Sequence, residues 1–157
     1  MEKVIRNLGK LVGLMGLIWF ITEWQQKCIN LWKNKAEKNR AKLMLMNQWV
    51  NIKQEGKRLE SFFLKNGYKR IAIYGMGEVG ERLVKELKDS EIGIEYGIDR
   101  NAQNIYSHIA LRTMEDNLPY VDAIVITAVG EFDNISGALH EKIGCPVIAI
   151  EDILNEI

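Results

Sequence analysis

The sequence has little cysteine, proline or histidine. Two of its 157 residues are Cys, two are Pro and two are His. Cys28 and Cys145 are too few and too far apart in the chain for a disulfide framework or a cysteine zinc site. Neither the histidines nor the carboxylates show metal-ligand spacing. We therefore expect a reducing compartment and a cytoplasmic protein with no metal site.

Patterns that carry catalysis are also scarce. None of the five tyrosines is followed by a lysine four residues on, so the Tyr-x-x-x-Lys pair of short-chain reductases is missing. His108 falls in a polar connection and His140 on an expected helix, and both are expected at the surface. Cys145 precedes Pro146 at the entry to a strand, which favours a buried structural thiol. No self-contained catalytic constellation is present, and whether the protein is an enzyme stays open.

The net charge of zero conceals a division of the chain. Residues 1–66 carry thirteen Lys/Arg against five Asp/Glu, a net charge of +8, whereas residues 67–157 carry eight against sixteen, a net charge of −8. The division falls at Asn66-Gly67, a dipeptide typical of a helix end. We therefore expect a helical arm over 1–66 and a separate domain over 67–157.

The arm contains an apolar run. Residues 11–22 carry no charge, and as a helix they would cover roughly 18 Å against the roughly 30 Å of a hydrocarbon core. From Lys27 to Lys42 there are six basic residues and one acidic residue. Two interpretations stay open: residues 11–42 lie on the inner face of the cell membrane, or they pack against a protein partner. No nucleic-acid-binding motif is present, so nucleic acid is not expected.

The end of the arm is amphipathic. One helical stripe collects the large apolar side chains, which are those of Leu45, Trp49, Ile52, Leu59 and Phe63. This spacing predicts one helix over 36–65, weakened locally at Gly56. The stripe must be buried against the following domain, the first helix or a second copy of the chain, and we expect a homodimer.

A glycine-rich turn follows the arm. The apolar run 70–74 predicts a buried strand that leads directly into Gly75, Gly77 and Gly80. A helical pattern and a second strand over 92–98 come next, and Asp99 stands nineteen residues after Gly80. This spacing is typical of a dinucleotide site: the glycines provide the tight turn, the close approach of the pyrophosphate and the close packing of helix on strand, while the acid binds ribose.

Strand and helix patterns alternate through the remainder of the chain. We expect strands over 109–111, 121–127 and 146–150, and helices over 131–143 and 151–157. The alternation predicts an α/β fold with a Rossmann-like, parallel five-stranded sheet in the order 3-2-1-4-5, preceded by the helical arm.

This topology places the residues after the fourth strand opposite the glycine turn. The expected cofactor-binding residues are Gly75, Met76, Gly77, Glu78, Val79, Gly80, Asp99, Arg100, Thr127 and Ala128, with Val129 beside them. Asp99 favours NAD because a 2′-phosphate would meet its negative charge, whereas Arg100 is compatible with NADP. Two alternatives stay open: Asp99 only caps a turn, and Glu78 repels a pyrophosphate.

Four strings carry a resemblance to a known group of domains. They are IAIYGMGEVGERLVKEL, YGIDRNA, VDAIVIT and CPVIAIEDIL. Together they resemble small Rossmann-type domains of bacterial exopolysaccharide and capsule biosynthesis, and more loosely the C-terminal domain of sugar C-methyltransferases. The resemblance covers 67–157 and implies a dinucleotide or nucleotide-sugar ligand, bound through the three glycines and Asp99, and a role in making cell-envelope glycans.

Three functions follow as hypotheses. The first is a nucleotide-binding module, accessory or sensory, that acts at the membrane with polysaccharide enzymes and binds NAD, NADP or a nucleotide sugar. The second is an oxidoreductase or epimerase-type subunit that acts on nucleotide sugars and is completed by a partner chain. The third is a ligand-free interaction protein in which the arm is the functional part.

Overall fold

The structure is a computed structural model, and the side chains that it describes are those of residues 1, 13 and 15–157. The chain forms two compact units, residues 1–40 and 41–157. We call them the arm unit and the body. In chain order the elements are α1 (Glu2–Gln54), α2 (Glu60–Lys65), β1 (Arg70–Tyr74), α3 (Glu78–Leu87), β2 (Gly93–Ile98), the 3₁₀ helix η1 (Ala102–Asn104), β3 (Leu111–Arg112), β4 (Ala123–Ile126), α4 (Phe132–His140), β5 (Val147–Ala149) and α5 (Ile150–Glu156).

The body is built on one parallel sheet in the order β3-β2-β1-β4-β5. This confirms the predicted fold class and strand order. Short apolar runs rich in Ile and Val form β1, β4 and β5, and β4 is buried at all four positions. A strand buried on both faces reads as a continuous apolar run, which is why β1 and β4 could be recognised in the sequence.

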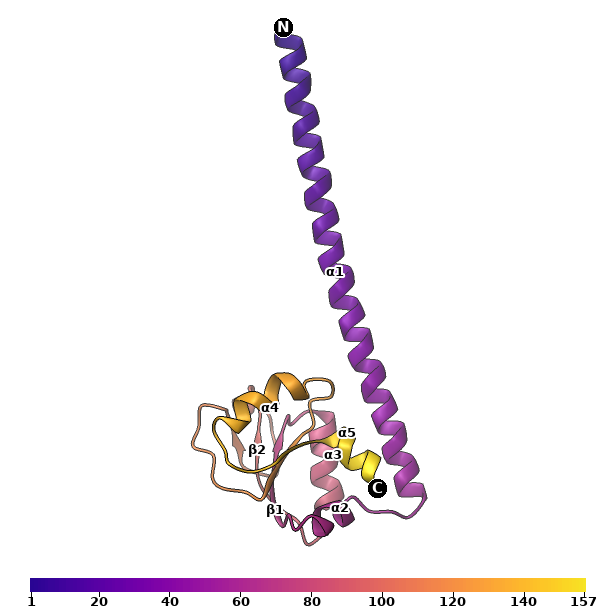
Figure 1. Ribbon diagram of the computed structural model, residues 1–157, viewed down its shortest axis with the longest axis vertical. Helices are drawn as coiled ribbons and strands as arrows, with labels where there is room; N and C mark the ends of the chain where they lie inside the picture. The colour runs from indigo at the N-terminus through magenta and orange to yellow at the C-terminus, as the bar shows by residue number, and fades with distance from the viewer. The chain divides into compact units, whose positions relative to one another are not determined.

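Each face of the sheet carries its own core. Ile71 and Ile73 of β1 face a cluster that includes side chains of α1, α2, α3 and α5, whereas Ala72 between them faces a cluster that includes Leu139 of α4. The alternation follows from the two-residue period of a strand. Figure 1 shows α3 and α4 on opposite sides of the strands.

The connections around β3 differ from the expected alternation of strand and helix. One turn of 3₁₀ helix, η1, lies between β2 and β3, and residues 113–122, all of them described, contain no helix. Polar side chains fix this connection instead. The Tyr96 hydroxyl donates a hydrogen bond to the Pro119 carbonyl at 2.7 Å, and Arg112 donates one to the Asn117 carbonyl at 3.0 Å.

The amphipathic stretch 36–65 is two helices and not the single helix predicted. α1 ends at Gln54, and Gly56 adopts a left-handed conformation with φ +74°. The Lys57 amide then reaches back to the Ile52 carbonyl at 3.1 Å, which is the hydrogen bond of a glycine-terminated helix. The same device ends α2 at Gly67, φ +74°, where a stop was predicted.

The body begins earlier in the chain than the charge division suggests. Leu45, Trp49 and Ile52 of α1 are at most 6% exposed and pack in the same core as Leu59 and Phe63. Residues 41–66, assigned to the arm from the sequence, therefore belong to the body. Of the three burial sites considered for the apolar stripe, the structure uses the domain that follows it.

We predict that a chain starting at Ala41 keeps the body folded and that one starting at Gly67 does not. Removal of 1–66 deletes six buried side chains, from Leu45, Trp49, Ile52, Leu59, Phe62 and Phe63. At about 1.5–3 kcal/mol each, their combined loss is as large as the typical free energy of unfolding of a domain. Thermal unfolding followed by circular dichroism should show one cooperative transition for 41–157 and none for 67–157. A cooperative transition in 67–157 would contradict this boundary.

Asp122 ties the start of β1 to the start of β4. Its Oδ2 accepts hydrogen bonds from the amides of Lys69 at 2.9 Å and Arg70 at 2.8 Å. These bonds lower the pKa of the Asp122 carboxyl, and the bond from the Arg70 amide has the larger effect. A lowered folded-state pKa contributes stability above the unfolded-state pKa, and this contribution is lost as the pH falls through the folded-state value.

We therefore predict that Asp122→Asn lowers the melting temperature at pH 7 and that the gap to the wild-type protein closes under acid. The gap should begin to narrow below about pH 3.9, the pKa of an aspartate in an unfolded chain. Asp133→Asn, on the exposed first turn of α4, is the matched control. A gap that stays constant from pH 7 to acid would show that the carboxylate charge does not stabilise this junction.

Candidate functional site

The glycine turn lies where the sequence placed it, between β1 and α3. Gly75 has φ +97°, a conformation that favours glycine, and its amide donates a hydrogen bond to the Ile98 carbonyl of β2 at 2.8 Å. Gly77 is the N-cap of α3, and no side chain caps this helix. A Cβ on Gly77 would meet open space. The first turn of α3 is therefore open to an anion at its positive end.

Gly80 packs α3 tightly against the turn. A Cβ at this position would collide with the carbonyl oxygen of Gly75 and would lie 3.2 Å from the Thr127 hydroxyl. Its neighbour Val79 is buried and contributes to the core. Gly80 thus has the role expected of the third glycine, the close approach of helix and strand.

Thr127 directly follows β4 and supports the turn through its hydroxyl group. Its side chain is only 4% exposed, and its hydroxyl is within hydrogen-bond distance of the carbonyl oxygens of Tyr74 at 3.1 Å and Gly75 at 2.5 Å. The hydroxyl is therefore committed to the β1 backbone. This places the Thr127 side chain in a supporting position, while the next residue, Ala128, lines the cavity described below.

Both carboxylate oxygens of Asp99 accept hydrogen bonds from backbone amides, one of them from the glycine turn. Oδ2 accepts a hydrogen bond from the Met76 amide at 2.8 Å, and Oδ1 accepts one from the Asn101 amide at 2.9 Å. The second bond is the local turn cap considered as an alternative for this residue. The two roles are compatible because each carboxylate oxygen has a further lone pair for a ligand hydroxyl.

Met76 fills a space left by a fourth glycine. Its side chain is buried, and a Cβ on Gly97 of β2 would lie 2.7 Å from its Cγ and Sδ atoms. The Met76 side chain is therefore part of the core. Its backbone amide contributes to the site by donating a hydrogen bond to Asp99.

A cavity of about 300 Å³ opens beside the turn, at the carboxyl ends of β1, β2 and β4. Its lining residues are Tyr74, Gly75, Asp99, Arg100, Ala128, Glu131, Asn134 and Ile135. Strand order reverses between β1 and β4, and this switch point is where open parallel sheets bind ligands. Four of the ten residues predicted from the sequence, Gly75, Asp99, Arg100 and Ala128, meet in this cavity.

The polar groups of the cavity suit a ligand rich in hydroxyl groups. Carboxylates of Asp99 and Glu131 provide acceptors, and the Asn134 amide binds Glu131 at 2.9 Å. Burial raises the pKa of Tyr74, and Asp99 raises it further against the opposing Arg100 charge. The phenol is therefore neutral at pH 7 and able to donate a hydrogen bond.

Glu78 is engaged by two basic side chains. It forms ion pairs with Lys42 of α1 and with Arg82, whose Nη2 lies 3.2 Å from Oε1. The Lys42 ammonium, and after it the Arg82 guanidinium, lowers the pKa of Glu78. Two cations beside one carboxylate reverse the local charge, which weakens the repulsion of a phosphate considered from the sequence. The Val129 side chain, expected near a ligand, packs against the core on the α3 side of the sheet.

Several cavity residues could not be identified from the sequence. Glu131, Asn134 and Ile135 come from the start of α4, and the only available signal was that this helix follows the strand across the switch point. Lys42 lies thirty-six residues before Glu78 in the chain, and no local pattern joins them. Cys145 is buried as expected, and burial raises the pKa of its thiol. His108 and His140 are exposed, also as expected.

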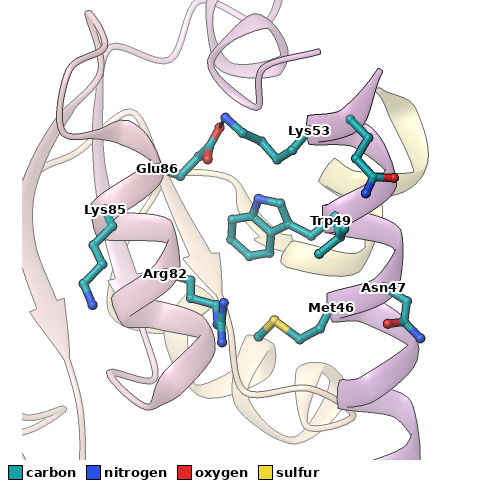
Figure 2. A pocket seen from close by; sticks show the side chains of 9 residues that line it. Met46, Asn47, Trp49, Lys53, Arg82, Lys85 and Glu86 are labelled. Atoms are coloured by element: carbon teal, nitrogen blue, oxygen red, sulfur yellow. Dashed lines mark hydrogen bonds and ion pairs between the residues drawn. The ribbon is translucent and has the colours of Figure 1, made fainter. Parts of the chain in front are cut away.

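A second, larger cavity of about 630 Å³ lies between the end of α1 and α3 (Figure 2). Trp49 reaches from α1 toward α3 in this view, and Lys53 faces Glu86, with Nζ 2.9 Å from Oε1. Two of its charged groups are thus paired across the two helices, and Arg82 is paired with Glu78 within α3. It lies at a helix packing contact rather than at the carboxyl edge of the sheet, and we assign it no ligand.

The fold and the turn define a Rossmann-like α/β protein. Comparisons with protein-family models, curated protein sequences and solved structures found no match to this chain. In the part of the chain whose side chains are described, no helix has an apolar stretch of the length needed to cross a membrane. The functional argument therefore depends on the geometry of the site.

We predict that alanine substitution lowers the free energy of unfolding at one glycine of the turn and leaves it nearly unchanged at another. Gly80→Ala should lower the free energy of unfolding by about 1–3 kcal/mol, because the new Cβ meets the Gly75 carbonyl. Gly77→Ala should leave it nearly unchanged, because the space beside Gly77 is open and its φ of −77° suits any residue. Urea denaturation measures both. Equal losses in the two variants would contradict the packing described for α3.

Proposed function

We propose that the body is a nucleotide-binding module that takes NAD, NADP or a nucleotide sugar. The observation that carries the proposal is the juxtaposition of an uncapped helix start at Gly77 with the cavity that contains Asp99. The helix start offers free amides and a positive dipole for phosphate. The cavity offers acceptors and a neutral phenol for the hydroxyls of ribose or another sugar.

The size and charge of the cavity support a division of the ligand between two places. A volume of about 300 Å³ lies at the lower end of the range for ligand pockets, so it suits one nucleoside or sugar unit. The phosphates would then lie outside it, over the first turn of α3. The Asp99 carboxylate favours NAD over NADP because a 2′-phosphate beside it would be repelled, while Arg100 offsets part of this repulsion.

The wider role is proposed on other grounds. The resemblance of four strings to exopolysaccharide and capsule domains supports an accessory or sensory role in cell-envelope glycan synthesis. It also makes nucleotide sugars the second ligand class. The basic arm unit supports a location at the inner face of the cell membrane. In the second hypothesis a partner chain would complete an oxidoreductase or epimerase-type subunit.

We predict that NAD, NADP or a UDP-sugar raises the melting temperature of the full chain. A ligand at 100 times its dissociation constant should stabilise the protein by about 2.7 kcal/mol. Gly77→Trp should abolish the shift because its ring would occupy the space over the helix start. Gly144→Trp is the matched control, since Gly144 also faces open space but lies before β5, away from the switch point. Thermal-shift titration measures all three proteins.

The relative affinities for NAD and NADP separately test whether Asp99 binds the ribose. Asp99→Asn should weaken NAD binding and narrow the difference between NAD and NADP, because it removes the charge that repels a 2′-phosphate. If no nucleotide shifts the wild-type protein, the glycine turn is only a packing device and the third hypothesis, a ligand-free interaction protein, replaces this one.

A further inference from the structure

The arm unit presents apolar side chains on all sides of the helix. Every position from 15 to 21 except Gly16 carries a large apolar side chain that is 49–69% exposed, namely Met15, Leu17, Ile18, Trp19, Phe20 and Ile21. Seven consecutive positions complete almost two helical turns. This stretch therefore has no polar face. A helix that is apolar all round is stable only where its whole circumference is buried.

The next three turns are amphipathic. At about 100° per residue, most of the polar side chains gather within an arc of about 120°, and Gln25 is the exception, because it lies beside Trp32. The residues of the polar arc are Glu23, Gln26, Lys27, Asn30 and Lys33. Gln26 donates a hydrogen bond to Asn30 at 3.1 Å along this arc. Trp24, Leu31 and Trp32 occupy the opposite arc, and they are 62–70% exposed. Only one side of this stretch requires burial.

The last part of the arm unit is basic. Five Lys/Arg and one Asp/Glu lie between Lys27 and Arg40. Lys35 places its ammonium 5.6 Å from the centre of the Trp32 ring, so one cation is next to the apolar arc. Along the helix, the surface therefore passes from apolar all round, through apolar on one side, to positively charged.

We propose that residues 13–40 bind an anionic lipid membrane, with 15–21 in the hydrocarbon, 23–33 along the interface and the basic end at the headgroups. A lipid phase surrounds a single helix completely, whereas one partner helix covers only one side of it. Residues 15–21 rise roughly 10 Å, about a third of the roughly 30 Å hydrocarbon core, so this stretch enters one leaflet without crossing the bilayer. Anionic headgroups complement the basic end. This inference gives the proposed membrane location its lipid chemistry and does not depend on nucleotide binding.

The main competing occupant is a second copy of the chain. In a parallel pair of helices, the basic stretch 33–40 of one copy would lie beside the same stretch of the other, and like charges repel. A two-stranded contact would also bury one side of 15–21 and leave the other in water. Charge and geometry therefore both favour lipid over self-association.

Flotation of the full chain with vesicles tests the proposal. The protein should float with phosphatidylcholine vesicles that contain about a third phosphatidylglycerol, and much less with pure phosphatidylcholine. Neutralisation of three cations in Lys33→Gln, Lys35→Gln and Arg40→Gln together should weaken binding to the anionic vesicles roughly a hundredfold. Added salt should also weaken binding of the wild-type protein to the anionic vesicles, because it screens the charges. Equal binding to both kinds of vesicle would overturn the assignment of anionic lipid.

A pair of charge substitutions separates lipid from a protein partner. Met15 and Leu17 point to nearly opposite sides of the helix, so Met15→Glu and Leu17→Glu should reduce flotation equally if lipid surrounds the helix. Asn30→Glu adds the same charge on the polar arc and should keep most of the binding. Circular dichroism should show an unchanged melting temperature of the body in all three variants.

Two results would overturn the proposal. One is no flotation of the wild-type protein together with a stable oligomer in sedimentation, which would make the arm unit a protein-docking helix. The other is loss of flotation in only one of the two Glu variants, which would indicate a one-sided contact. Gly77→Trp should float like the wild-type protein, so failure of nucleotide binding and failure of membrane binding remain separate results.

Discussion

The close approach of Gly80 to the Gly75 carbonyl is the constraint on which the site depends. It fixes how α3 leaves β1, and the Thr127 hydroxyl holds the same carbonyl from the side of β4. With the turn fixed from both directions, the Met76 amide meets the Asp99 carboxylate at the end of β2. Three neighbouring strands are thereby joined at one point, and Gly77 is left open above it.

In the function that we propose, this arrangement would give one part of the site to phosphate and another to hydroxyl groups. The helix start provides free amides, and the cavity behind it contains the carboxylates of Asp99 and Glu131 and the neutral phenol of Tyr74. Lys42 contributes from α1 by binding Glu78, the residue that follows Gly77 at the start of α3. The part of α1 that belongs to the body thus supplies both core side chains and this lysine.

The sequence predicted the elements better than the contacts between them. Buried strands such as 70–74 and the glycine spacing are local patterns, so the sheet order and the turn were predicted correctly. Gly56 was expected to weaken a helix and instead ends it, because a left-handed glycine lets the chain fold back so that Leu59 and Phe63 reach the core. The body therefore begins at Ala41, although the charge pattern changes at residue 67.

The sequence by itself determined the Rossmann-like fold, the glycine turn and the presence of a basic, apolar arm. All three follow from local patterns: the periodicity of apolar residues, the spacing of glycines and the distribution of charge along the chain. Only the tertiary structure decided that Thr127 supports the turn while Ala128 faces the cavity, and that Glu131 and Asn134 join Asp99. It also decided that α1 joins the core on the α3 side of the sheet through Trp49. These contacts depend on which segments, distant in sequence, pack in the same core. Hydrophobic burial and the fit of side chains throughout the body select those segments.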